Sequence, residues 1–448
     1  MNILELSEQE IGRRQSLQEL INMGIDPYPA AEFPTNAFSE DIITDFKEDE
    51  KREVVIAGRM MTRRVMGKAS FVELQDSKGR IQVYITRDDI CPGEDKDLYN
   101  KVFKKLLDIG DFIGIKGFVF KTQTGEVSVH AQEVTLLSKS IKPLPIVKYK
   151  DGVAYDKFDD PELRARQRYV DLIVNDGVKD TFLKRATVIR TMRKYFDEAG
   201  YTEVETPTLQ SIPGGATAHP FITHFNALNI DMYLRIATEL YLKRLIVGGL
   251  ERVYEVGRIF RNEGMDPKHN PEFTTVELYQ AYTDFHGMMD VAEGLVSSAA
   301  KELLGAYEAE WMGEKIDLTP GWPRLTMVEA VKRYAGVDFG AISDDAEAVA
   351  AAKAIGVELA ESAEKTWGNA LYQCFDQKVE EHLVQPTFIT MYPVEVSPLT
   401  KRSPQDSRLT ERFEFFYAAS EGGNAFSELN DPIDQRQRFE RQVALRAA

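Results

Sequence analysis

Five runs of alternating apolar and polar residues, all between residues 53 and 138, constrain the fold of this chain more than any other feature. The runs read EVVIAGRM, ASFVELQD, RIQVYIT, DFIGIKGFVF and EVSVHAQEVTLL. Successive side chains of a strand point to opposite faces, so each run predicts a strand with one buried face. The turn DSKG joins the second and third runs as a hairpin. So many short strands in one stretch indicate a small, separate β domain.

A helix-like segment, LYNKVFKKLLDIG, lies between the third and fourth runs. Three strands, a helix and two strands is the order of the OB-fold, a small barrel that commonly binds oligonucleotides. Other small barrels would give a similar order. We therefore expect an OB-fold domain over residues 51–140.

The rest of the chain divides around this domain. Apolar residues at helical spacing predict a helical arm within residues 1–50, and a basic linker follows the barrel over residues 141–155. From residue 156 to 448, helical segments mix with alternating strands, which predicts an antiparallel sheet flanked by helices. Residues 288–385 are rich in Ala and Glu, and we expect a helical insertion there. The predicted fold class is a multidomain α+β protein.

The formal net charge of -17 argues against a surface covered with basic groups, so any nucleic-acid contact must be local. Cys91 and Cys374 have no metal-ligand spacing, and we expect free thiols in a reducing compartment. No apolar run approaches the ~20 residues that span a bilayer. The N-terminus also lacks a secretory apolar core. We expect a cytoplasmic protein that does not bind membranes.

Residues 256–282, VGRIFRNEGMDPKHNPEFTTVELYQAY, form two alternating runs joined by a turn rich in Gly, Pro, His and Asn. Alternation places Arg261 and Glu263 on one side of the first run, and Glu277 with Tyr279 on one side of the second. The apolar residues opposite them would pack on helices and leave these four on an open face. One such hairpin alone could be a solvated face with ion pairs worth ~0.2–1 kcal/mol each.

Three other segments repeat this pattern. Glu414 lies opposite two phenylalanines in RFEFFY, and Glu239 lies just beyond an alternating run. In NAFSELND, one face would carry Asn424, Phe426, Glu428 and Asn430. One sheet face therefore collects many acids and an arginine, which is the composition of a functional site.

These motifs resemble a known family. FRNE followed by HNPEF resembles motif 2 of the class II aminoacyl-tRNA synthetases. The segment KRATVIRTMRKYFDEAGYTEVETPTL resembles their motif 1, which forms the dimer interface. With the N-terminal OB-fold, essentially the whole chain is similar to subclass IIb, which charges lysine, aspartate and asparagine, and in detail to the lysyl-tRNA synthetases. The resemblance implies a homodimer that joins L-lysine to ATP as lysyl-adenylate and transfers lysine to the 3' end of tRNA(Lys).

The resemblance also implies roles for single residues around ATP. Arg261 would be the catalytic residue that contacts the α-phosphate and the lysine carboxylate. Other positions would bind ATP: Glu263, His269, Asn270, Phe273 and Glu414. Glu414 and Glu421 resemble the ligands of Mg²⁺, a cation that prefers hard oxygen donors. Adenylate formation needs no protein nucleophile, because positioning and electrostatics dominate it.

The predicted lysine pocket is the part of the site where charge decides the substrate. By resemblance its members are Gly215, Glu239, Arg261, Glu277, Tyr279, Asn424, Phe426 and Glu428. An ammonium group entering a partly dry pocket needs acids around it, and Glu239 and Glu428 are the expected partners. An aspartate enzyme would need a cation aimed at the side chain. No spare arginine or lysine is evident on this face, which favours lysine.

The barrel is expected to contact RNA. Alternation places Phe71 and Gln82 on its polar face, where an aromatic ring can stack on an unpaired base. For Phe71 alone, a core position at the end of the barrel is an equal alternative. The resemblance implies that Phe71, Gln82 and Glu126 read the anticodon. Nearby cations would contact phosphates: Arg63, Arg64 and Lys68.

The family's third motif, a glycine-rich strand leading to a helix with an ATP-binding arginine, has no counterpart here. No glycine follows Gly423, and the chain ends RQRFERQVALRAA. Either the sequence is an incomplete version of a normal enzyme, or the chain truly ends here and its activity is doubtful. The upstream site residues are all in place, which favours the first explanation. The alternative functions are an aspartyl- or asparaginyl-type synthetase and a non-catalytic tRNA-binding paralogue.

Overall fold

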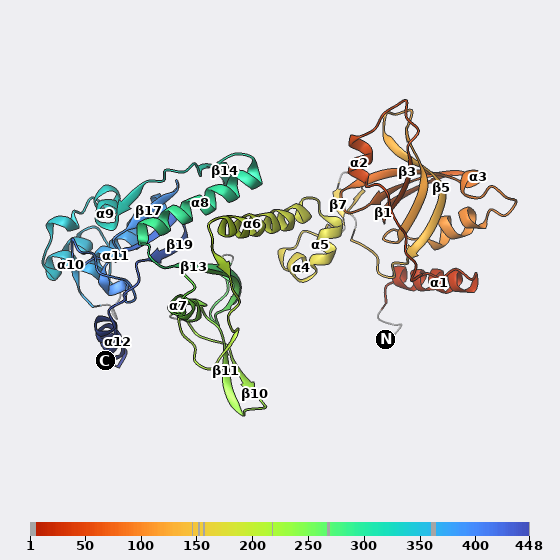
Figure 1. The fold of residues 1–448 in the computed structure, drawn as a ribbon. Coiled ribbons are helices and arrows are strands. Elements are labelled where there is room, and N and C mark those ends of the chain that lie inside the picture. The colour runs from red at the N-terminus through yellow and green to blue at the C-terminus, as the bar shows by residue number, and fades with distance from the viewer. Residues whose placement is uncertain are drawn as a thin grey trace. The chain divides into compact units, whose positions relative to one another are not determined.

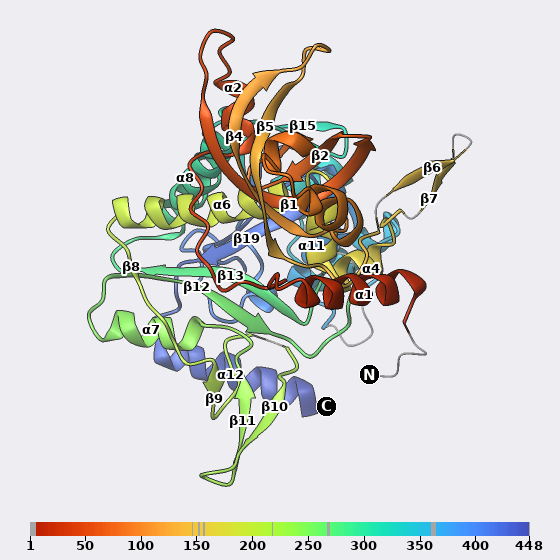
Figure 2. The same cartoon turned by 90° about the vertical axis from the view of Figure 1, so that its right-hand side faces the viewer.

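The computed structural model describes residues 6–145, 147–150, 153–155, 157–216, 218–266, 269–359 and 364–447. The chain forms two compact units, Met1–Lys179 and Asp180–Ala448. Each unit is described by itself below (Figures 1 and 2). Among the described residues, no helix combines the length and the apolar character needed to cross a membrane.

The first unit is built on a closed barrel with the strand order β1-β2-β3-β5-β4. Its strands are β1 (Glu53–Met66), β2 (Ala69–Gln75), β3 (Arg80–Thr86), β4 (Phe112–Lys121) and β5 (Val127–Ser138). Alternate residues of β2 and β3 are buried, as the sequence pattern predicts. A short helix α3 (Arg87–Ile90) and a π-helix (Leu98–Leu106) lie between β3 and β4. The predicted five-stranded barrel is therefore confirmed.

The N-terminal arm packs on the barrel. Helix α1 (Glu8–Asn22) begins at Ser7, which forms a capping box with Glu10, and α2 (Ser39–Thr44) follows. Leu20 of α1 and Ile42 of α2 are fully buried within the barrel's hydrophobic core. Arg13 also donates hydrogen bonds to backbone carbonyls between β3 and β4 and after β5. The arm is thus part of the barrel's core.

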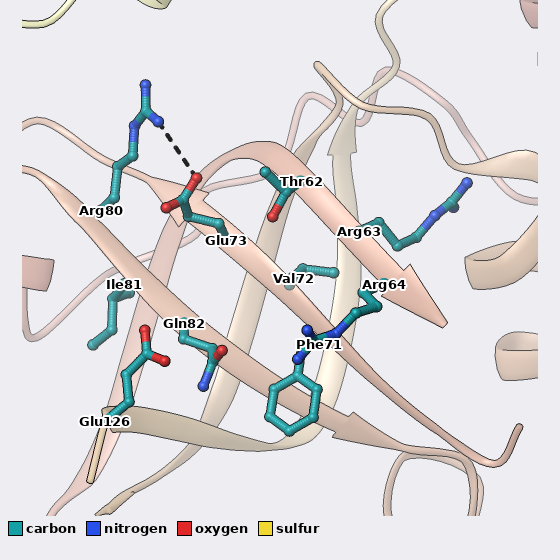
Figure 3. Close-up of a pocket in the computed structure, with 10 residues that line it drawn as sticks. All are labelled: Thr62, Arg63, Arg64, Phe71, Val72, Glu73, Arg80, Ile81, Gln82 and Glu126. Carbon is teal, nitrogen blue, oxygen red and sulfur yellow. Dashed lines mark hydrogen bonds and ion pairs between the residues drawn. The ribbon is translucent and has the colours of Figure 1, made fainter. Parts of the chain in front are cut away.

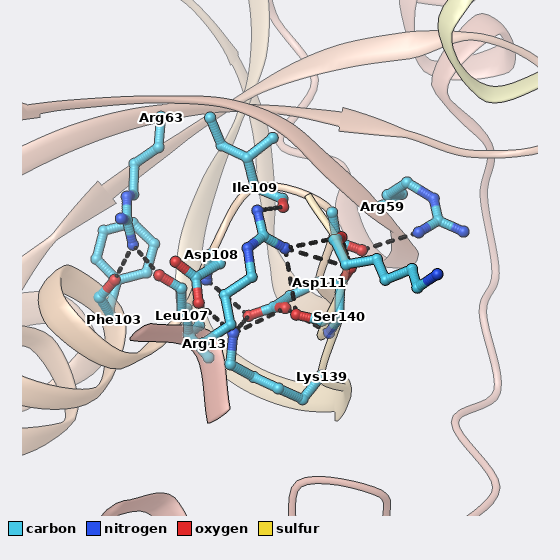
Figure 4. Close-up of polar contacts among 12 residues, drawn as sticks. Arg13, Arg59, Arg63, Phe103, Leu107, Asp108, Ile109, Asp111, Lys139 and Ser140 are labelled. Carbon is cyan, nitrogen blue, oxygen red and sulfur yellow. Dashed lines mark hydrogen bonds and ion pairs between the residues drawn. The ribbon is translucent and has the colours of Figure 1, made fainter. Parts of the chain in front are cut away.

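A buried charged group lies where β4 begins and β5 ends (Figure 4). The side chains of Lys139 and Asp111 are both fully buried. The Lys139 Nζ lies 3.0 and 3.1 Å from the two carboxylate oxygens of Asp111 and 2.5 Å from Asp108. Asp111 also accepts the backbone N–H groups of Asp108 and Ser140. Burial raises the pKa of Asp111 in spite of the adjacent ammonium.

The first unit continues beyond the predicted linker. Residues 141–155 carry a two-stranded hairpin, β6 (Lys148–Lys150) and β7 (Val153–Tyr155), although residues 146, 151 and 152 lie outside the described residues. Helices α4 (Pro161–Arg166) and α5 (Arg168–Val174) follow. Gln75 donates a hydrogen bond to the Ile173 carbonyl, so α5 is tied to the barrel. The boundary between the compact units therefore lies later than the predicted residue 156.

The second unit begins with α6 (Val178–Glu198) and a three-stranded sheet of order β13-β12-β8. Its strands are β8 (Thr202–Glu203), β12 (Arg252–Phe260) and β13 (Glu272–Gln280). One face packs on α6 and α8 (Phe285–Leu304), with Phe196, Tyr254 and Leu295 in one cluster. Helix α7 (Glu239–Val247) lies on the opposite side of the hairpin (Figures 1 and 2). The hairpin is therefore held between helices.

Two more sheets complete this framework. One has the order β10-β11-β9, with β9 (Leu209–Gln210), β10 (Ile222–Phe225) and β11 (Ile230–Leu234). The other has the order β16-β17-β18-β19, with β16 (Arg324–Thr326), β17 (Thr387–Thr390), β18 (Arg412–Tyr417) and β19 (Ser420–Phe426). Helices α9 (Met327–Ala335), α10 (Asp345–Ala354) and α11 (Trp367–Lys378) pack into one core with β17 and β18, and α12 (Pro432–Ala447) follows β19. In the described residues, the sheet expected from the sequence is thus divided into these three sheets, and a two-stranded hairpin forms a fourth.

The prediction of a helical insertion over residues 288–385 is wrong in part. This range contains the hairpin β14 (Glu308–Trp311) and β15 (Glu314–Asp317) and also β16. Strand β16 pairs in parallel with β17 and so belongs to the four-stranded sheet. Its three residues are too few to show an alternating pattern, which explains why the sequence did not reveal it.

Candidate functional site

The register of the β12–β13 hairpin fixes which side chains share a face. Glu255 pairs with Glu277, and Ile259 pairs with Phe273. Directly opposed residues lie on the same face, so Glu277, Tyr279 and Phe273 share the face that leads to Arg261. The shared face of Glu277 and Tyr279 is therefore confirmed, while Arg261 and Glu263 lie beyond the end of β12 at Phe260. Phe273 and Tyr279 are six residues apart, or ~20 Å along the strand, which leaves room for two ligand groups end to end.

The centre of this face is not open, contrary to the prediction. Glu255 is only 4% exposed and forms an ion pair with Arg235, whose Nη1 lies 2.5 Å from its carboxylate. Thr206 also donates its hydroxyl to Glu255. The Arg235 guanidinium lies over Gly257, where a Cβ would be 2.5 Å from its Nη2. Glu255 therefore holds the fold, and only the two ends of the face remain for ligands.

One end carries a group that we call the acidic cluster: Glu239, Lys243, Glu277, Tyr279 and Glu428. Glu277 accepts the backbone N–H of Thr238 and the Tyr279 hydroxyl, both at 3.3 Å. The Lys243 Nζ lies 2.6 Å from Glu239 and 2.9 Å from Glu428. Burial raises the pKa of Glu277 and of Glu428. Burial and the three carboxylates together raise the pKa of Tyr279 well above its ordinary value.

Gly215 lies beside this cluster. Its φ of +91° is in the left-handed region, and an added Cβ would lie 3.0 Å from Ala237 and 3.2 Å from the Glu239 Cβ. Both constraints favour glycine, because any side chain would be strained and crowded here. The loop that carries Gly215 can therefore approach Glu239 closely.

Two cations accompany these acids, although the sequence showed no spare arginine or lysine on this face. Lys243 lies between Glu239 and Glu428, and Arg412 forms an ion pair with Glu414. Lys243 stands four residues after Glu239 on α7, so helical spacing brings the two together. Each of these cations is already held by acids and is not aimed at a vacant anion site.

Strands β18 and β19 present the second group of predicted residues. Glu414 pairs with Asn424 and Arg412 with Phe426, so these four share a face. Strand β19 ends at Phe426, so the strand expected in NAFSELND is confirmed over residues 424–426 and wrong beyond them. Glu428 lies beyond that strand, in an isolated bridge with Thr400, and the ring of Phe426 is 5.7 Å from the Lys243 Nζ. Asn430 lies further still and is exposed.

The turn end of the hairpin carries Arg261. Its Nε is buried and has no hydrogen-bond partner among the described residues. Its guanidinium lies 5.3 Å from the centre of the Phe273 ring. A buried cationic donor without a partner is costly and suits an incoming anion. An aromatic face beside it suits a flat ring.

Other residues of the turn are exposed. Glu263 accepts the backbone N–H of His219 at 3.3 Å, and His269 contacts Asp266 at 2.7 Å. Asn270 is exposed, and residues 267 and 268 lie outside the described residues. These side chains flank the Arg261 end, and their contacts with a nucleotide stay a prediction.

Glu414 and Glu421 are the predicted ligands of Mg²⁺. Glu414 is buried, accepts the Tyr392 hydroxyl at 2.8 Å and forms the ion pair with Arg412. Burial raises the pKa of Glu414, and the nearby Glu421 raises it further. No set of three His, Cys, Asp or Glu residues among the described ones is placed to hold a metal. Mg²⁺ commonly uses only one or two carboxylates together with substrate phosphates, so the two glutamates fit.

The barrel carries a pocket that brings five predicted residues together (Figure 3). It is lined by Thr62, Arg63, Arg64, Phe71, Val72, Glu73, Arg80, Ile81, Gln82 and Glu126. Phe71 is partly exposed there, which argues against the core alternative. The Arg64 guanidinium lies 5.4 Å from its ring centre, and Gln82 donates to Ser128 at 3.0 Å. Aromatic, amide and cationic groups in one pocket suit an unpaired base and its phosphate.

Two residues predicted to contact phosphates, Arg63 and Lys68, have other surroundings than expected. Arg63 lines the pocket, but its Nη1 donates to the carbonyls of Phe103 and Leu107 and so caps the π-helix. Lys68 does not line the pocket and lies in the turn between β1 and β2. Sequence reasoning missed Tyr84, whose ring centre is 5.0 Å from that of Phe71. Tyr84 alternates with the buried residues of β3, and this pattern could have placed it on the same face as Gln82.

Comparisons with known proteins match this architecture. Residues 160–447 match the family described as tRNA synthetases class II (D, K and N), and residues 54–137 match the OB-fold nucleic acid binding domain. A lysine–tRNA ligase of Porphyromonas gingivalis W83 is 58% identical over 448 residues, which cover 99% of this chain and 77% of that protein. One from Azobacteroides pseudotrichonymphae is 55% identical over 98% of this chain and 88% of its own length. One from Thermoanaerobacter sp. X514 is 51% identical over 100% of this chain and 87% of its own length.

Proposed function

Because the chain belongs to the class II tRNA synthetases for aspartate, lysine and asparagine, we propose that it is a lysine–tRNA ligase. It joins L-lysine to ATP as lysyl-adenylate with release of diphosphate, and then transfers lysine to the 3' end of tRNA(Lys). The observation that carries the choice of lysine is the acidic cluster. Three carboxylates and a tyrosine hydroxyl meet there, and they suit a cationic side chain.

Adenylate formation is an attack of the lysine carboxylate on the α-phosphate of ATP. Both groups are anionic, so the protein must align them and stabilise the charge that develops between them. The buried Nε of Arg261, which lacks a hydrogen-bond partner among the described residues, supports this role for Arg261. Phe273 beside it offers a ring for adenine. The acidic cluster holds the ammonium groups of lysine at the other end of the hairpin.

Mg²⁺ would be held by Glu414 and Glu421, where it would neutralise phosphate charge. The ion pair with Arg412 and the hydrogen bond from Tyr392 fix the Glu414 carboxylate in place. Glu263, His269 and Asn270 would enclose the nucleotide from the turn.

The barrel pocket would bind the anticodon, with Phe71 stacked on a base, and Gln82 and Glu126 reading base edges. Arg64 would contact a phosphate. We also propose that the protein is cytoplasmic and dimerises through α6, on which Leu183 is 55% exposed. Light scattering at micromolar concentration would test the dimer.

The decisive assay is exchange of labelled diphosphate into ATP in the presence of single amino acids. Exchange that depends on lysine, but not on aspartate or asparagine, is the expected result. Exchange driven only by aspartate would refute the assignment of the acidic cluster. Tight binding of the tRNA with no exchange for any amino acid, and no calorimetric binding of L-lysine, would favour a non-catalytic tRNA-binding protein.

A further inference from the structure

Lys243 occupies a position that no assigned role explains. Its side chain is 25% exposed, and its Nζ contacts carboxylates from two separate elements, Glu239 on α7 and Glu428 after β19. The ring of Phe426 lies 5.7 Å away and covers a further side of the ammonium. A lysine that serves only solubility would extend into solvent. Lys243 instead joins two of the acids expected to hold the substrate.

The charges of the acidic cluster can be counted against those of the substrate. The cluster holds the carboxylates of Glu239, Glu277 and Glu428 and the ammonium of Lys243, so three negative charges less one positive charge leave two. Free lysine carries two ammonium groups and one carboxylate, and Arg261 is available to the carboxylate. The two net negative charges of the acidic cluster therefore balance the two ammonium groups of free lysine. Without Lys243, three carboxylates would repel one another and one would be without a partner.

We propose that Lys243 is a positioning residue that holds Glu239 and Glu428 together and sets the charge of the cluster for a diamino acid. This inference rests on the proposed function, because it takes lysine as the substrate. Lys243 does not touch the reacting atoms. Its ammonium fixes the separation of two carboxylates that would otherwise repel each other, one on α7 and one in the bridge with Thr400 that follows β19.

The test is calorimetric titration of the 448-residue chain with L-lysine, which requires no catalysis. We expect Lys243→Ala to weaken lysine binding about tenfold or more, and Lys243→Arg to stay within about threefold of wild type. Ethylammonium ions added to Lys243→Ala should restore much of the lost affinity, because they supply the missing charge. The matched control is Lys332→Ala, which removes another pair between a helical lysine and a carboxylate, here Asp338, whose side chains are 61% and 41% exposed. It should bind lysine within about twofold of wild type.

Three results would overturn the inference. Lys243→Ala could bind lysine as tightly as wild type, or more tightly, which would make Lys243 a bystander or a competitor. Lys243→Ala could lose binding without rescue by ethylammonium and with a lowered melting temperature, which would make Lys243 a structural residue. If wild-type protein binds no lysine at all, the proposed function fails together with the inference. Loss of binding that ethylammonium reverses at an unchanged melting temperature would support it.

Discussion

Replacing Lys139 with methionine should destabilise the barrel strongly, because it removes the cation that pairs with the buried Asp111 carboxylate. Lys139 and Asp111 are both fully buried, and Asp111 would keep only the backbone N–H groups of Asp108 and Ser140. Methionine matches the length of the lost side chain, so little packing changes. The perturbation therefore isolates the charge.

The magnitude follows from two bounds. Breaking a buried ion pair by removing one partner typically costs ~3–5 kcal/mol. Asp111 can also take up a proton, since burial already raises its pKa, and this escape limits the loss to the lower part of that range. We expect a loss of about 3–4 kcal/mol, or about 6–16 °C in melting temperature at about 2–4 °C per kcal/mol for a unit of this size. Because the folded pKa of Asp111 would be raised further, the loss should shrink as the pH falls.

The assay is thermal unfolding followed by two probes. All three tryptophans, Trp311, Trp322 and Trp367, lie in the second unit, so tryptophan fluorescence reports that unit alone. Far-UV circular dichroism reports both units. Lys139→Met should lower the melting temperature of the barrel transition and leave the tryptophan transition unchanged.

The matched control is Lys116→Met, which removes a pair with Glu133 whose side chains are 51% and 59% exposed. It should cost less than about 1 kcal/mol. Adding Asp111→Leu to Lys139→Met should recover most of the stability, since an apolar pair of similar volume is often neutral. A shift in Lys139→Met no larger than in the control would refute the argument that the buried charge decides the effect.

Three further predictions concern the sites. Phe71→Ala should weaken binding of an anticodon stem–loop with unpaired uridines by ~1–3 kcal/mol, or about 5–150-fold, while Phe71→Tyr should keep most of the affinity. Fluorescence anisotropy titration measures this affinity, and a loss under about twofold in Phe71→Ala would contradict stacking. Arg261→Gln should lower lysine-dependent diphosphate exchange by about 100-fold or more, and near-normal exchange would exclude Arg261 from the phosphate. Burial raises the pKa of Glu428, and a protonated Glu428 cannot pair with an ammonium group. The affinity for L-lysine, measured by calorimetric titration, should therefore fall as the pH is lowered from about 8 to about 5. Glu428→Gln should flatten that profile, and an equally steep profile in the variant would assign the titration to another group.

The alternating runs made the barrel and the hairpin predictable from the sequence. In both, strands of seven or more residues repeat the pattern often enough to show which residues share a face. Strand β16 has three residues and shows no such pattern. The end of β19 was also missed, because alternation continues through residues 427–430, of which only Glu428 forms a bridge, with Thr400. Pattern length therefore decides what the sequence can reveal.

The acids of the site were predictable as a group, but their partners were not. Alternation identifies a face and gives no information on what covers it. Glu255 and Glu277 are direct cross-strand neighbours with the same chemistry, yet Arg235 closes over the first and Tyr279 accompanies the second. The ion pair that buries Glu255 comes from a segment twenty residues earlier, which no local pattern relates to the hairpin.

One local signal does distinguish these two acids. Gly257 interrupts an otherwise large-residue strand on the same face as Glu255, and a glycine inside a strand often marks the close approach of another group. That group is the Arg235 guanidinium, which would collide with any Cβ at residue 257. A carboxylate beside such a glycine is therefore expected to pair with the side chain that packs against the glycine. Glu277 faces no glycine on its own strand, and it is the acid that stays within the acidic cluster.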